Sequence, residues 1–315
     1  MTTSQTRRPV APSLNEGVPL AGYALGIAGS VLFAGKGIVI KLAYAEGIDP
    51  ETLLALRMGL SLPFYLAVGL MAVRRLRGQS AALPPRRLLL RAAAVGVLGF
   101  WFSSYTDFLG LRFISASFER LILFTYPLFV ALFAAVLFGE RVQHRALVAF
   151  AASYVGLALI FVENMAAGGA MVGQGVAWVM LAAVSFALYQ LLAKRSITVL
   201  GPQIFTCVAM SAAAFVALAQ FALLRPLSNL MVSPHLFALS LFIAFGGTVL
   251  PSFLMSASLQ RISAQANATI GTVSPVATMA IAFLILGEVP VPLEMVGALV
   301  VMGSIGWFTL SGRRR

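Results

Sequence analysis

Apolar runs of about 20 residues follow one another along nearly the whole chain, separated by short polar gaps that often contain glycine or proline. A run of that length is what a helix needs to cross a bilayer. The pattern predicts an all-α polytopic membrane protein with ten transmembrane helices. The predicted spans are 21–43, 52–73, 88–110, 115–138, 145–162, 173–193, 203–223, 236–257, 264–286 and 292–311.

Composition agrees with this prediction, because 60% of the residues are hydrophobic and only 10% are charged, against about 25% charged in soluble domains. The net charge of +12 comes from basic clusters between the spans. This position indicates charges that set the orientation of the helices in the membrane rather than a surface that binds nucleic acid. The lipid bilayer is therefore the expected environment.

Lysines and arginines at the ends of the spans and in the connections between them divide unequally between the two predicted faces, and the richer face is expected to be cytoplasmic. One face has Arg7, Arg8, Arg74, Arg75, Arg77, Arg86, Arg87, Arg91, Arg141, Arg145, Lys194, Arg195, Arg261 and Arg313 to Arg315, and the other has Lys41, Arg112 and Arg225. Both termini should be cytoplasmic, and we expect a multi-pass protein of a bacterial inner (plasma) membrane.

An internal repeat appears when the chain is shifted by 148 residues, so that 99–140 faces 247–288 without a gap. Eleven of these positions are identical, where composition alone would give roughly three or four. The identical residues include Gly99/Gly247, Ser104/Ser252, Leu111/Leu259, Ile122/Ile270, Pro127/Pro275 and Glu140/Glu288.

The repeat divides the chain into two halves of five predicted helices. Because five is odd, the halves should cross the membrane in opposite directions, an arrangement typical of alternating-access transporters. The expected organisation is a cytoplasmic tail (1–20), a first repeat (21–163), a linker (164–172), a second repeat (173–311) and a basic tail (312–315).

Two short motifs carry a resemblance to a known family. Ile114-Ser-Ala-Ser117, Pro127 and Gly139-Glu140 are echoed by Ile262-Ser-Ala-Gln265, Pro275 and Gly287-Glu288. The chain resembles the paired EamA domains of the drug/metabolite transporter superfamily, over residues 22 to 311. The resemblance implies a bacterial metabolite exporter with a central cavity lined by helices 1, 3, 4, 6, 8 and 9, and with helices 5 and 10 peripheral.

Lys36 is the most informative polar residue inside a predicted span. It shares one helical stripe with Gly22, Gly26 and Gly29, and a glycine stripe packs against other helices. Lys36 should therefore point inward to bind substrate, although snorkelling or a structural ion pair is the alternative.

Helix 3 places Ser103, Ser104 and Asp107 close together on one face, with Trp101 and Tyr105 to one side. Asp107 is the natural partner for Lys36 or Arg57, because a buried charge needs a counter-charge or a proton. Asp107 and Arg57 are candidates for a proton or ion-pair site, and a purely stabilising pair is the alternative.

Helices 4 and 9 carry polar stripes at repeat-equivalent positions. Candidate substrate contacts are Glu119, Leu123 and Tyr126 on the first stripe and Asn267, Gly271 and Ser274 on the second, with Ser104, Trp101 and Tyr105 on helix 3 and Trp178, Ser185 and Tyr189 on helix 6. Interhelical hydrogen bonding, or an interfacial position for Trp178, would explain some of them without a substrate.

Prolines inside predicted helices indicate bends, because proline frees a backbone carbonyl. Pro127, Pro251 and Pro275 are candidate hinges, and Glu140 and Glu288, each at a helix end after glycine, are candidate gates that bond to neighbouring loops.

No nucleotide-binding, zinc-protease or esterase motif occurs, and Cys207 is the single cysteine. We therefore expect neither an enzyme nor a cofactor or metal site. The leading hypothesis is a secondary transporter that exports or equilibrates a small polar metabolite, with amino acids first. The alternatives are efflux of drugs or cationic amphiphiles, transport of a vitamin or nucleotide derivative, a channel, and an intramembrane enzyme or receptor. The protein can be a monomer or a homodimer.

Overall fold

The computed structural model describes residues 20–78, 84–139, 144–168, 171–262, 267, 270, 273–289 and 292–311, and over these residues it is all-helical. Three short segments depart from the α-helix: η1 (Val97–Phe102) and η3 (Phe245–Val249) are π-helical and η2 (Leu227–Leu230) is a 3₁₀ helix. The α-helices are α1 (Leu20–Ala34), α2 (Lys36–Ala45), α3 (Pro50–Gly78), α4 (Arg86–Gly96), α5 (Ser103–Leu111), α6 (Ala116–Leu123), α7 (Tyr126–Phe138), α8 (His144–Gly168), α9 (Met171–Leu200), α10 (Pro202–Leu224), α11 (Pro234–Ala244), α12 (Leu250–Arg261), α14 (Val273–Leu286) and α15 (Pro292–Ser311).

Helical stretches long and apolar enough to cross a membrane recur along the described residues, and the protein is a multi-pass membrane protein. The eight full-length candidates are Leu20–Ala45, Pro50–Gly78, Arg86–Leu111, Ala116–Leu137, Leu147–Met165, Met171–Leu200, Pro202–Leu224 and Pro234–Arg261. Two shorter apolar helices, Ser274–Leu286 and Pro292–Phe308, follow them. Each candidate overlaps one of the spans predicted from the sequence.

The predicted linker at 164–172 is mostly helical, which corrects that prediction. Helix α8 continues through Gly168 and α9 already begins at Met171. Helix α9 also extends past the predicted end at 193 to Leu200, because the first helix-breaking residue is Gly201, which has a φ of +75°.

Interruptions of the spans occur at positions that the repeat relates. The π-segments η1 and η3 begin 148 residues apart, at Val97 and Phe245, which is the offset of the sequence repeat. A π-turn leaves a local irregularity in the helix and is frequent at functional sites. The first span is also broken at Gly35, between α1 and α2.

The predicted hinge prolines lie near helix starts. Pro127 follows the break between α6 and α7, and Pro251 is the second residue of α12, which follows η3 directly. Pro275 lies in the first turn of α14. Pro63 is a proline within α3 that the sequence analysis did not single out.

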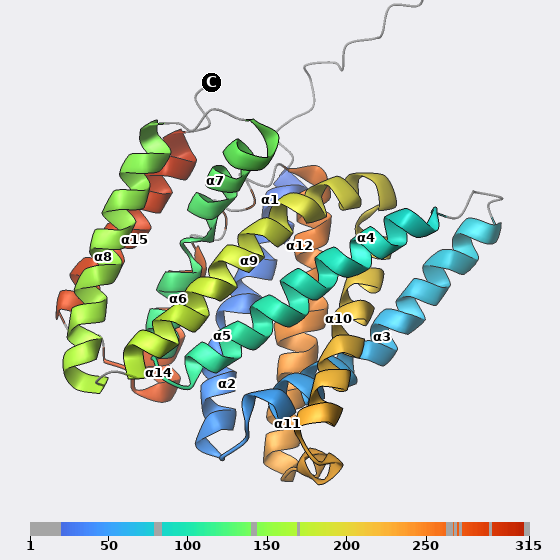
Figure 1. The fold of residues 1–315 in the computed structure, drawn as a ribbon, viewed down its shortest axis with the longest axis horizontal. Helices are drawn as coiled ribbons and strands as arrows, with labels where there is room; N and C mark the ends of the chain where they lie inside the picture. The colour runs from blue at the N-terminus through green and yellow to red at the C-terminus, as the bar shows by residue number, and fades with distance from the viewer. Residues whose placement is uncertain are drawn as a thin grey trace, which may run out of the picture.

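The helices pack in repeat-equivalent pairs. Helix α1 lies along α12 and α14, and correspondingly α9 lies along α5, α6 and α7. Helix α3 packs against α10, and α8 packs against α15; Figure 1 shows α8 and α15 side by side at one edge of the molecule. Helices α8 and α15, which correspond to the predicted fifth and tenth spans, are thus peripheral, as the family resemblance implied.

Two lysines repeat the same contact in the two halves. The Lys41 ammonium donates a hydrogen bond of 3.0 Å to the carbonyl of Leu111, at the end of α5. Lys194 donates to the carbonyl of Leu259, near the end of α12, and to that of Ile262 at 2.9 Å. Leu111 and Leu259 are one of the identical pairs of the repeat. Each lysine therefore satisfies carbonyls that the end of a helix leaves without an intrahelical donor.

Glycines allow α1 to approach its neighbours closely. A Cβ atom at Gly22 would lie 2.9 Å from Arg261, and one at Gly26 would lie 2.7 Å from Ile270. A Cβ atom at Gly29 would be 3.0 Å from Met255 in α12. The predicted glycine stripe therefore packs against helices of the second repeat and turns Lys36 inward.

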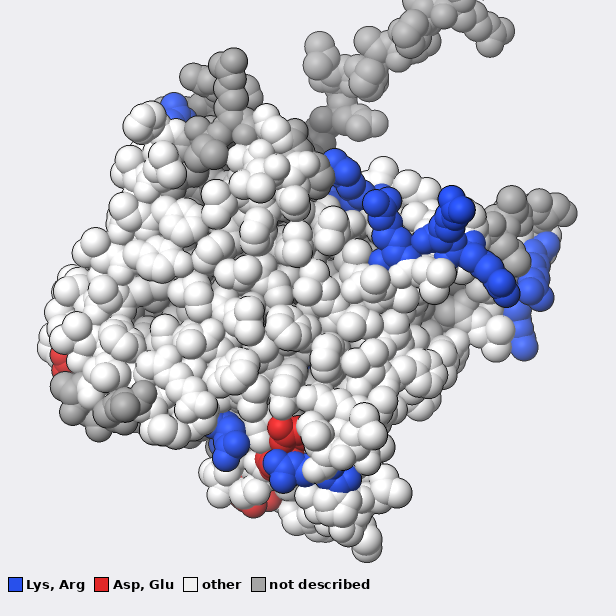
Figure 2. Space-filling model, in the orientation of Figure 1, with Lys and Arg blue, Asp and Glu red and all other residues white. Residues whose placement is uncertain are grey.

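Charge is concentrated at the edges of the molecule. Figure 2 shows a basic band along one edge and a smaller group of both signs at the opposite edge, with a broad uncharged surface between them. Exposed arginines at the end of α3 and the start of α4 are Arg74, Arg75, Arg77, Arg86, Arg87 and Arg91. An uncharged surface between charged edges fits lipid contact.

Candidate functional site

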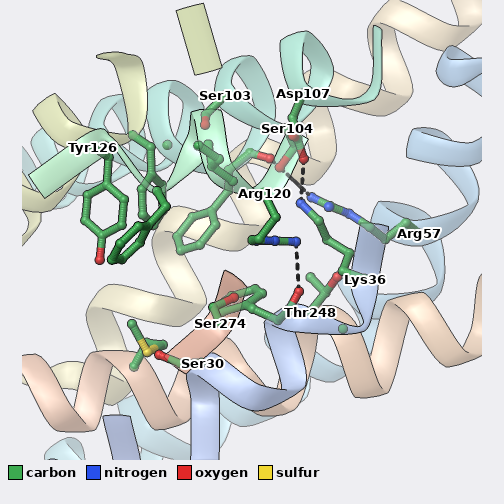
Figure 3. Close-up of a pocket in the computed structure, with 18 residues that line it drawn as sticks. Ser30, Lys36, Arg57, Ser103, Ser104, Asp107, Arg120, Tyr126, Thr248 and Ser274 are labelled. Atoms are coloured by element: carbon green, nitrogen blue, oxygen red, sulfur yellow. Dashed lines mark hydrogen bonds and ion pairs between the residues drawn. The ribbon is translucent and has the colours of Figure 1, made fainter. Parts of the chain in front are cut away.

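A cavity of about 100 Å³ lies between helices of both repeats. A buried water needs roughly 10–15 Å³ of such space, so the cavity can hold several waters or part of a small solute. Figure 3 shows the polar side chains converging on it. It is lined by Ser30, Phe33, Lys36, Arg57, Gly99, Phe100, Ser103, Ser104, Asp107, Arg120, Leu123, Phe124, Tyr126, Phe186, Gly247, Thr248, Met255 and Ser274.

A buried ion pair occupies one end of the cavity. The Lys36 ammonium lies 2.8 Å from Asp107 Oδ2, and the two side chains are 9% and 2% exposed. Lys36 is the first residue of α2, directly after the break at Gly35, and Asp107 is in α5. The predicted inward position of Lys36 and its predicted pairing with Asp107 are both present. Such a pair lowers the cost of burying either charge.

Arg57 faces the same end of the cavity from α3. Its Nη2 donates to Ser104 Oγ at 3.0 Å and to the Phe100 carbonyl, in η1, at 3.3 Å. Both cations make cation–π contacts with the ring of Phe108. Arg57 Cζ lies 5.2 Å and Lys36 Nζ lies 5.7 Å from the ring centroid. The second helix thus contributes to the cavity, which the family resemblance did not imply.

Helix α6 adds one acidic and one basic side chain, Glu119 and Arg120. Arg120 Nη2 donates to the Phe33 carbonyl at 3.1 Å, and its Nε lies 3.7 Å from Glu119 Oε2. Glu119 is fully buried behind the cavity wall, where its carboxylate lies against the first turn of α2: a Cβ atom at Gly37 would be 3.2 Å from Oε2.

The other end of the cavity is apolar and aromatic. The ring of Phe186, from α9, meets that of Tyr126 edge to face at 5.1 Å. Leu123 and Phe124 from α6 and its end, and Met255 from α12, complete this side. The cavity is therefore amphipathic, with charged groups at one end and a hydrophobic compartment at the other.

Several sequence candidates do line the cavity: Lys36, Arg57, Ser104, Asp107, Leu123, Tyr126 and Ser274. Tyr126 and Ser274 are repeat-equivalent, as are Gly99 and Gly247, and all four lie in the lining. Both repeats therefore contribute equivalent positions to one cavity.

Trp101 and Tyr105 do not line it, which corrects their assignment. Their rings stack with an interplanar angle of 4°. The Trp101 indole donates to Gln220 Oε1 at 2.7 Å, and the Tyr105 hydroxyl donates to Glu51 Oε1 at 2.9 Å. Partly buried Trp and Tyr need polar partners, and these two find theirs on α10 and α3.

The helix 6 candidates also lie outside the lining. Tyr189 fills the space above Gly99, where a Cβ atom would be 2.2 Å from its ring, and packs against Phe100 at 4.9 Å. The Ser185 hydroxyl bonds to the Ala182 carbonyl within α9. Trp178 is only partly buried in that helix. Helix α9 contributes Phe186 to the cavity instead.

The remaining candidates are buried behind the cavity or fall outside the described residues. Asn267 is fully buried, and its Oδ1 accepts a hydrogen bond of 2.9 Å from Ser258. Gly271 and Glu140 lie outside the residues that the structure describes.

Sequence reasoning missed several lining residues as substrate contacts, among them Ser30, Phe33, Phe100, Arg120, Phe124, Phe186, Thr248 and Met255. For Thr248 a signal existed, because it follows Gly247, the repeat mate of Gly99. The phenylalanines carry no such signal, since the chain has 23 of them.

Glu288, predicted as a gate residue, joins the two repeats at the end of the molecule where Lys41 lies. Its Oε1 accepts a hydrogen bond from the Ala116 N–H at 3.1 Å. Oε2 accepts from the Ser117 N–H at 3.2 Å and from the Ser117 hydroxyl at 2.8 Å. The carboxylate of the second repeat thus caps the start of α6 in the first.

The chain matches the model of the EamA-like transporter family over residues 20–162 and 173–310. The chain belongs to the EamA-like transporter family. The two matched segments correspond to the two sequence repeats, and the protein is accordingly a transporter rather than an enzyme.

Individual relatives agree with this family membership. The chain is 29% identical over 306 residues to the uncharacterized transporter YcbK of Bacillus subtilis (strain 168), covering 93% of this chain and 92% of that protein. It is 32% identical over 271 residues to a probable terminal-alkyne amino-acid exporter of Streptantibioticus cattleyicolor, covering 81% and 82%. A solved structure, described as a crystal structure of protein, shares the fold of this chain, with a TM-score of 0.66 at 19% identity over 93% of this chain and 97% of the other.

Proposed function

We propose that this EamA-like protein is a secondary transporter that exports or equilibrates amino acids by alternating access. The observation that carries the proposal is the amphipathic cavity, in which a charged end and an aromatic end face each other between the two repeats. An amino acid has the matching parts: a carboxylate, an ammonium group and a side chain.

The balance of charge supports binding of a carboxylate. Three cationic side chains line the cavity: Lys36, Arg57 and Arg120. Only two acids are close to them, Asp107 in the lining and Glu119 buried beside it. One positive charge is left over when all five groups are ionised. Cations therefore outnumber acids at this end of the cavity, which favours placing the substrate carboxylate near Lys36 and Arg120.

The remaining groups suit the rest of an amino acid. Asp107, whose Oδ1 has no hydrogen-bond partner among the described residues, can accept a hydrogen bond from an ammonium group. Phe100, Tyr126 and Phe186 offer an apolar surface to a side chain. The similarity to a protein named as a probable amino-acid exporter supports the same substrate class.

We also propose that the repeats are inverted, with ten transmembrane helices and with both termini in the cytoplasm of a bacterial cell. The match of π-segments, lysine contacts and helix pairs between the halves supports a symmetric architecture. Inverted halves that rock about a site between them give alternating access.

The proposal is tested by exchange of amino acids in proteoliposomes. Purified protein is reconstituted with one unlabelled amino acid inside, and saturable uptake of the same labelled amino acid is measured for each of the proteinogenic amino acids. We expect saturable exchange for at least one with an apolar side chain, lost in Lys36→Met and kept in the surface variant Arg86→Ala.

Two results would contradict the proposal. Absence of exchange across the whole panel, from protein that unfolds cooperatively on heating, would exclude amino acids. Exchange of cationic amphiphiles that depends on Asp107 but survives Lys36→Met would support a drug efflux transporter instead.

A further inference from the structure

Arginines cluster without acidic partners where α3 ends and α4 begins. The arginine patch consists of Arg74 and Arg75, near the end of α3, and Arg87 and Arg91, in the first two turns of α4. All four are exposed, and none of them takes part in an ion pair among the described residues. The basic band in Figure 2 has no acidic side chain beside it in that view. The charges of the patch are therefore not compensated by the protein itself.

Arginines at this place are unfavourable for α4. The helix begins with Arg86 and Arg87, has no acidic residue in its first turn, and receives no side-chain cap from Pro85. The start of a helix carries partial positive charge, which repels cations. Basic residues in the connection before the helix would orient the span equally well. An anion at the guanidinium groups would offset both the dipole and the repulsion among the arginines.

Exposed apolar side chains lie beside the patch on the same helices. Leu70 and Met71 are 51% and 58% exposed, and they precede the two arginines of α3 by one turn. Leu90 is 70% exposed and lies between the two patch arginines of α4. Residues three and four apart are neighbours on a helix surface, so each helix changes from basic to apolar within one turn. Arg86 lies outside the patch, about 100° from Arg87 around the helix axis.

This change from basic to apolar sets the depth of the patch in the membrane. The exposed leucines and Met71 belong in hydrocarbon, and the guanidinium groups lie about one helical turn, or about 5 Å, beyond them. That is the depth of the lipid headgroups, where the phosphate is the available anion. A guanidinium group matches a phosphate as a planar donor with several N–H groups.

We infer that the arginine patch is a binding site for anionic phospholipids, with the phosphate on the guanidinium groups and the acyl chains along Leu70, Met71 and Leu90. A zwitterionic lipid carries its own cation and compensates the patch only in part. A soluble anion compensates the charges but has no hydrocarbon to place on the apolar side chains. The lipid site goes beyond the proposed function and is independent of which solute crosses the membrane.

Lipid at the patch bears on the cavity because both helices lead into it. Helix α3 carries Arg57, and α4 continues through η1 into α5, which carries Asp107. Bound lipid holds the ends of two helical segments whose other parts line the cavity. We therefore expect anionic lipid to stabilise the folded protein.

The test compares two lipids with identical acyl chains, phosphatidylglycerol and phosphatidylcholine, on the purified full-length protein in neutral detergent. Native mass spectrometry counts the lipids retained during titration, and thermal unfolding is measured on the same samples. We expect tighter retention of phosphatidylglycerol and a higher unfolding temperature with it, because a ligand that binds only the folded state stabilises that state. Raising the salt from about 0.1 M to about 1 M should weaken the preference, since the Debye length falls from about 10 Å to about 3 Å.

Variants that remove charge locate the site. The double variant Arg87→Gln with Arg91→Gln should raise the apparent dissociation constant for phosphatidylglycerol about 25-fold, at about fivefold per arginine. Arg74→Gln with Arg75→Gln should do the same. The control Arg112→Gln, which removes an exposed arginine after the end of α5, should leave the constant unchanged. Retention of phosphatidylcholine should be equal in all variants.

Three results would overturn the proposal. Equal retention of the two lipids by the wild-type protein would do so without any variant. A loss per arginine in Arg112→Gln equal to that in the patch variants would replace the site by diffuse attraction to net charge. Stabilisation by poly-L-glutamate, a soluble polyanion, to the same extent as by phosphatidylglycerol would assign the patch to an acidic protein partner instead.

Discussion

The Glu288 carboxylate and the Ser117 hydroxyl lie 2.8 Å apart, although they belong to different repeats. Glu288 follows the end of α14, yet it serves the start of α6, where its two oxygens also accept the Ala116 and Ser117 N–H groups. At the end of its own helix the dipole disfavours a carboxylate. At the start of a helix the dipole favours one.

Removal of this cap should destabilise the protein and loosen the contact between repeats. We expect Glu288→Ala to lower the free energy of unfolding by about 0.5–2 kcal/mol, as loss of an N-terminal cap does. Thermal unfolding in detergent measures the change, with Glu163→Ala as the control acid. Equal shifts for the two variants would show that the cap contributes nothing.

Close backbone approach between α8 and α15 gives a second prediction. A Cβ atom at Gly297 would lie 2.5 Å from Ile160 and 2.6 Å from the Gly156 carbonyl, whereas one at Gly303 of the same helix would meet nothing within 4 Å. Gly297→Ala should therefore cost about 1–3 kcal/mol, and Gly303→Ala should be tolerated. Thermal unfolding of both variants measures this difference, and similar stability of the two variants would contradict the close packing of α8 against α15 at Gly297.

Features set by the bilayer could be predicted from the sequence. Apolar windows located the spans because a membrane helix must bury its whole length in lipid or protein. The inward position of Lys36 followed from the glycines on its stripe, since glycines mark close helix contact. Asp107 followed as the nearest acid that could compensate a buried ammonium group.

Features that depend on distant partners could not be predicted. Trp101 and Tyr105 share a helix with Ser104 and Asp107, but Gln220 and Glu51 draw them away from the cavity. Tyr189 lies outside the cavity because Gly99 leaves room for its ring. The helical wheel orders residues around one helix, but it does not indicate which neighbour each face will meet.

Asp49 makes stability depend on pH at the start of α3. It accepts hydrogen bonds from the Thr52 N–H at 2.9 Å and the Thr52 hydroxyl at 2.7 Å, and it lies 3.4 Å from Arg225. Burial raises the pKa of Asp49, but these hydrogen bonds and Arg225 outweigh it and hold that pKa below its ordinary value. The stabilisation is therefore present above the unfolded-state pKa of about 3.9 and is lost as the pH falls through the folded-state pKa.

Asp49→Ala should lower the free energy of unfolding by about 1 kcal/mol at neutral pH. The difference from wild type should shrink as the pH falls below about 4, because protonation removes the same interactions from the wild-type protein. Thermal unfolding from pH 7 to pH 3 measures this convergence. A difference that stays constant across the range would assign the effect to packing alone.

The buried pair Lys36–Asp107 should show strong energetic coupling. Lys36→Met or Asp107→Leu alone leaves an uncompensated buried charge and should cost about 3–5 kcal/mol, whereas the double variant should recover most of that loss. A double-mutant cycle of unfolding free energies measures the coupling. Additive losses would mean that each charge is compensated independently of the other. Amino-acid exchange should be absent from all three variants, because the recovery concerns folding and not the site.

The inverted arrangement predicts that repeat-equivalent connections lie on opposite sides of the membrane. The end of α3 at Gly78 and the connection at Ser228, after α10, correspond closely under the offset of 148 residues, and both are exposed. We expect a membrane-impermeant thiol reagent to label Ser228→Cys in intact bacterial cells and Gly78→Cys only after permeabilisation, with Cys207 first replaced by Ala. Labelling of both positions from outside, or of neither, would mean that the repeats are parallel. The arginines near Gly78 predict that this position is cytoplasmic. Labelling of Gly78→Cys alone in intact cells would therefore support inverted repeats but place both termini outside the cytoplasm.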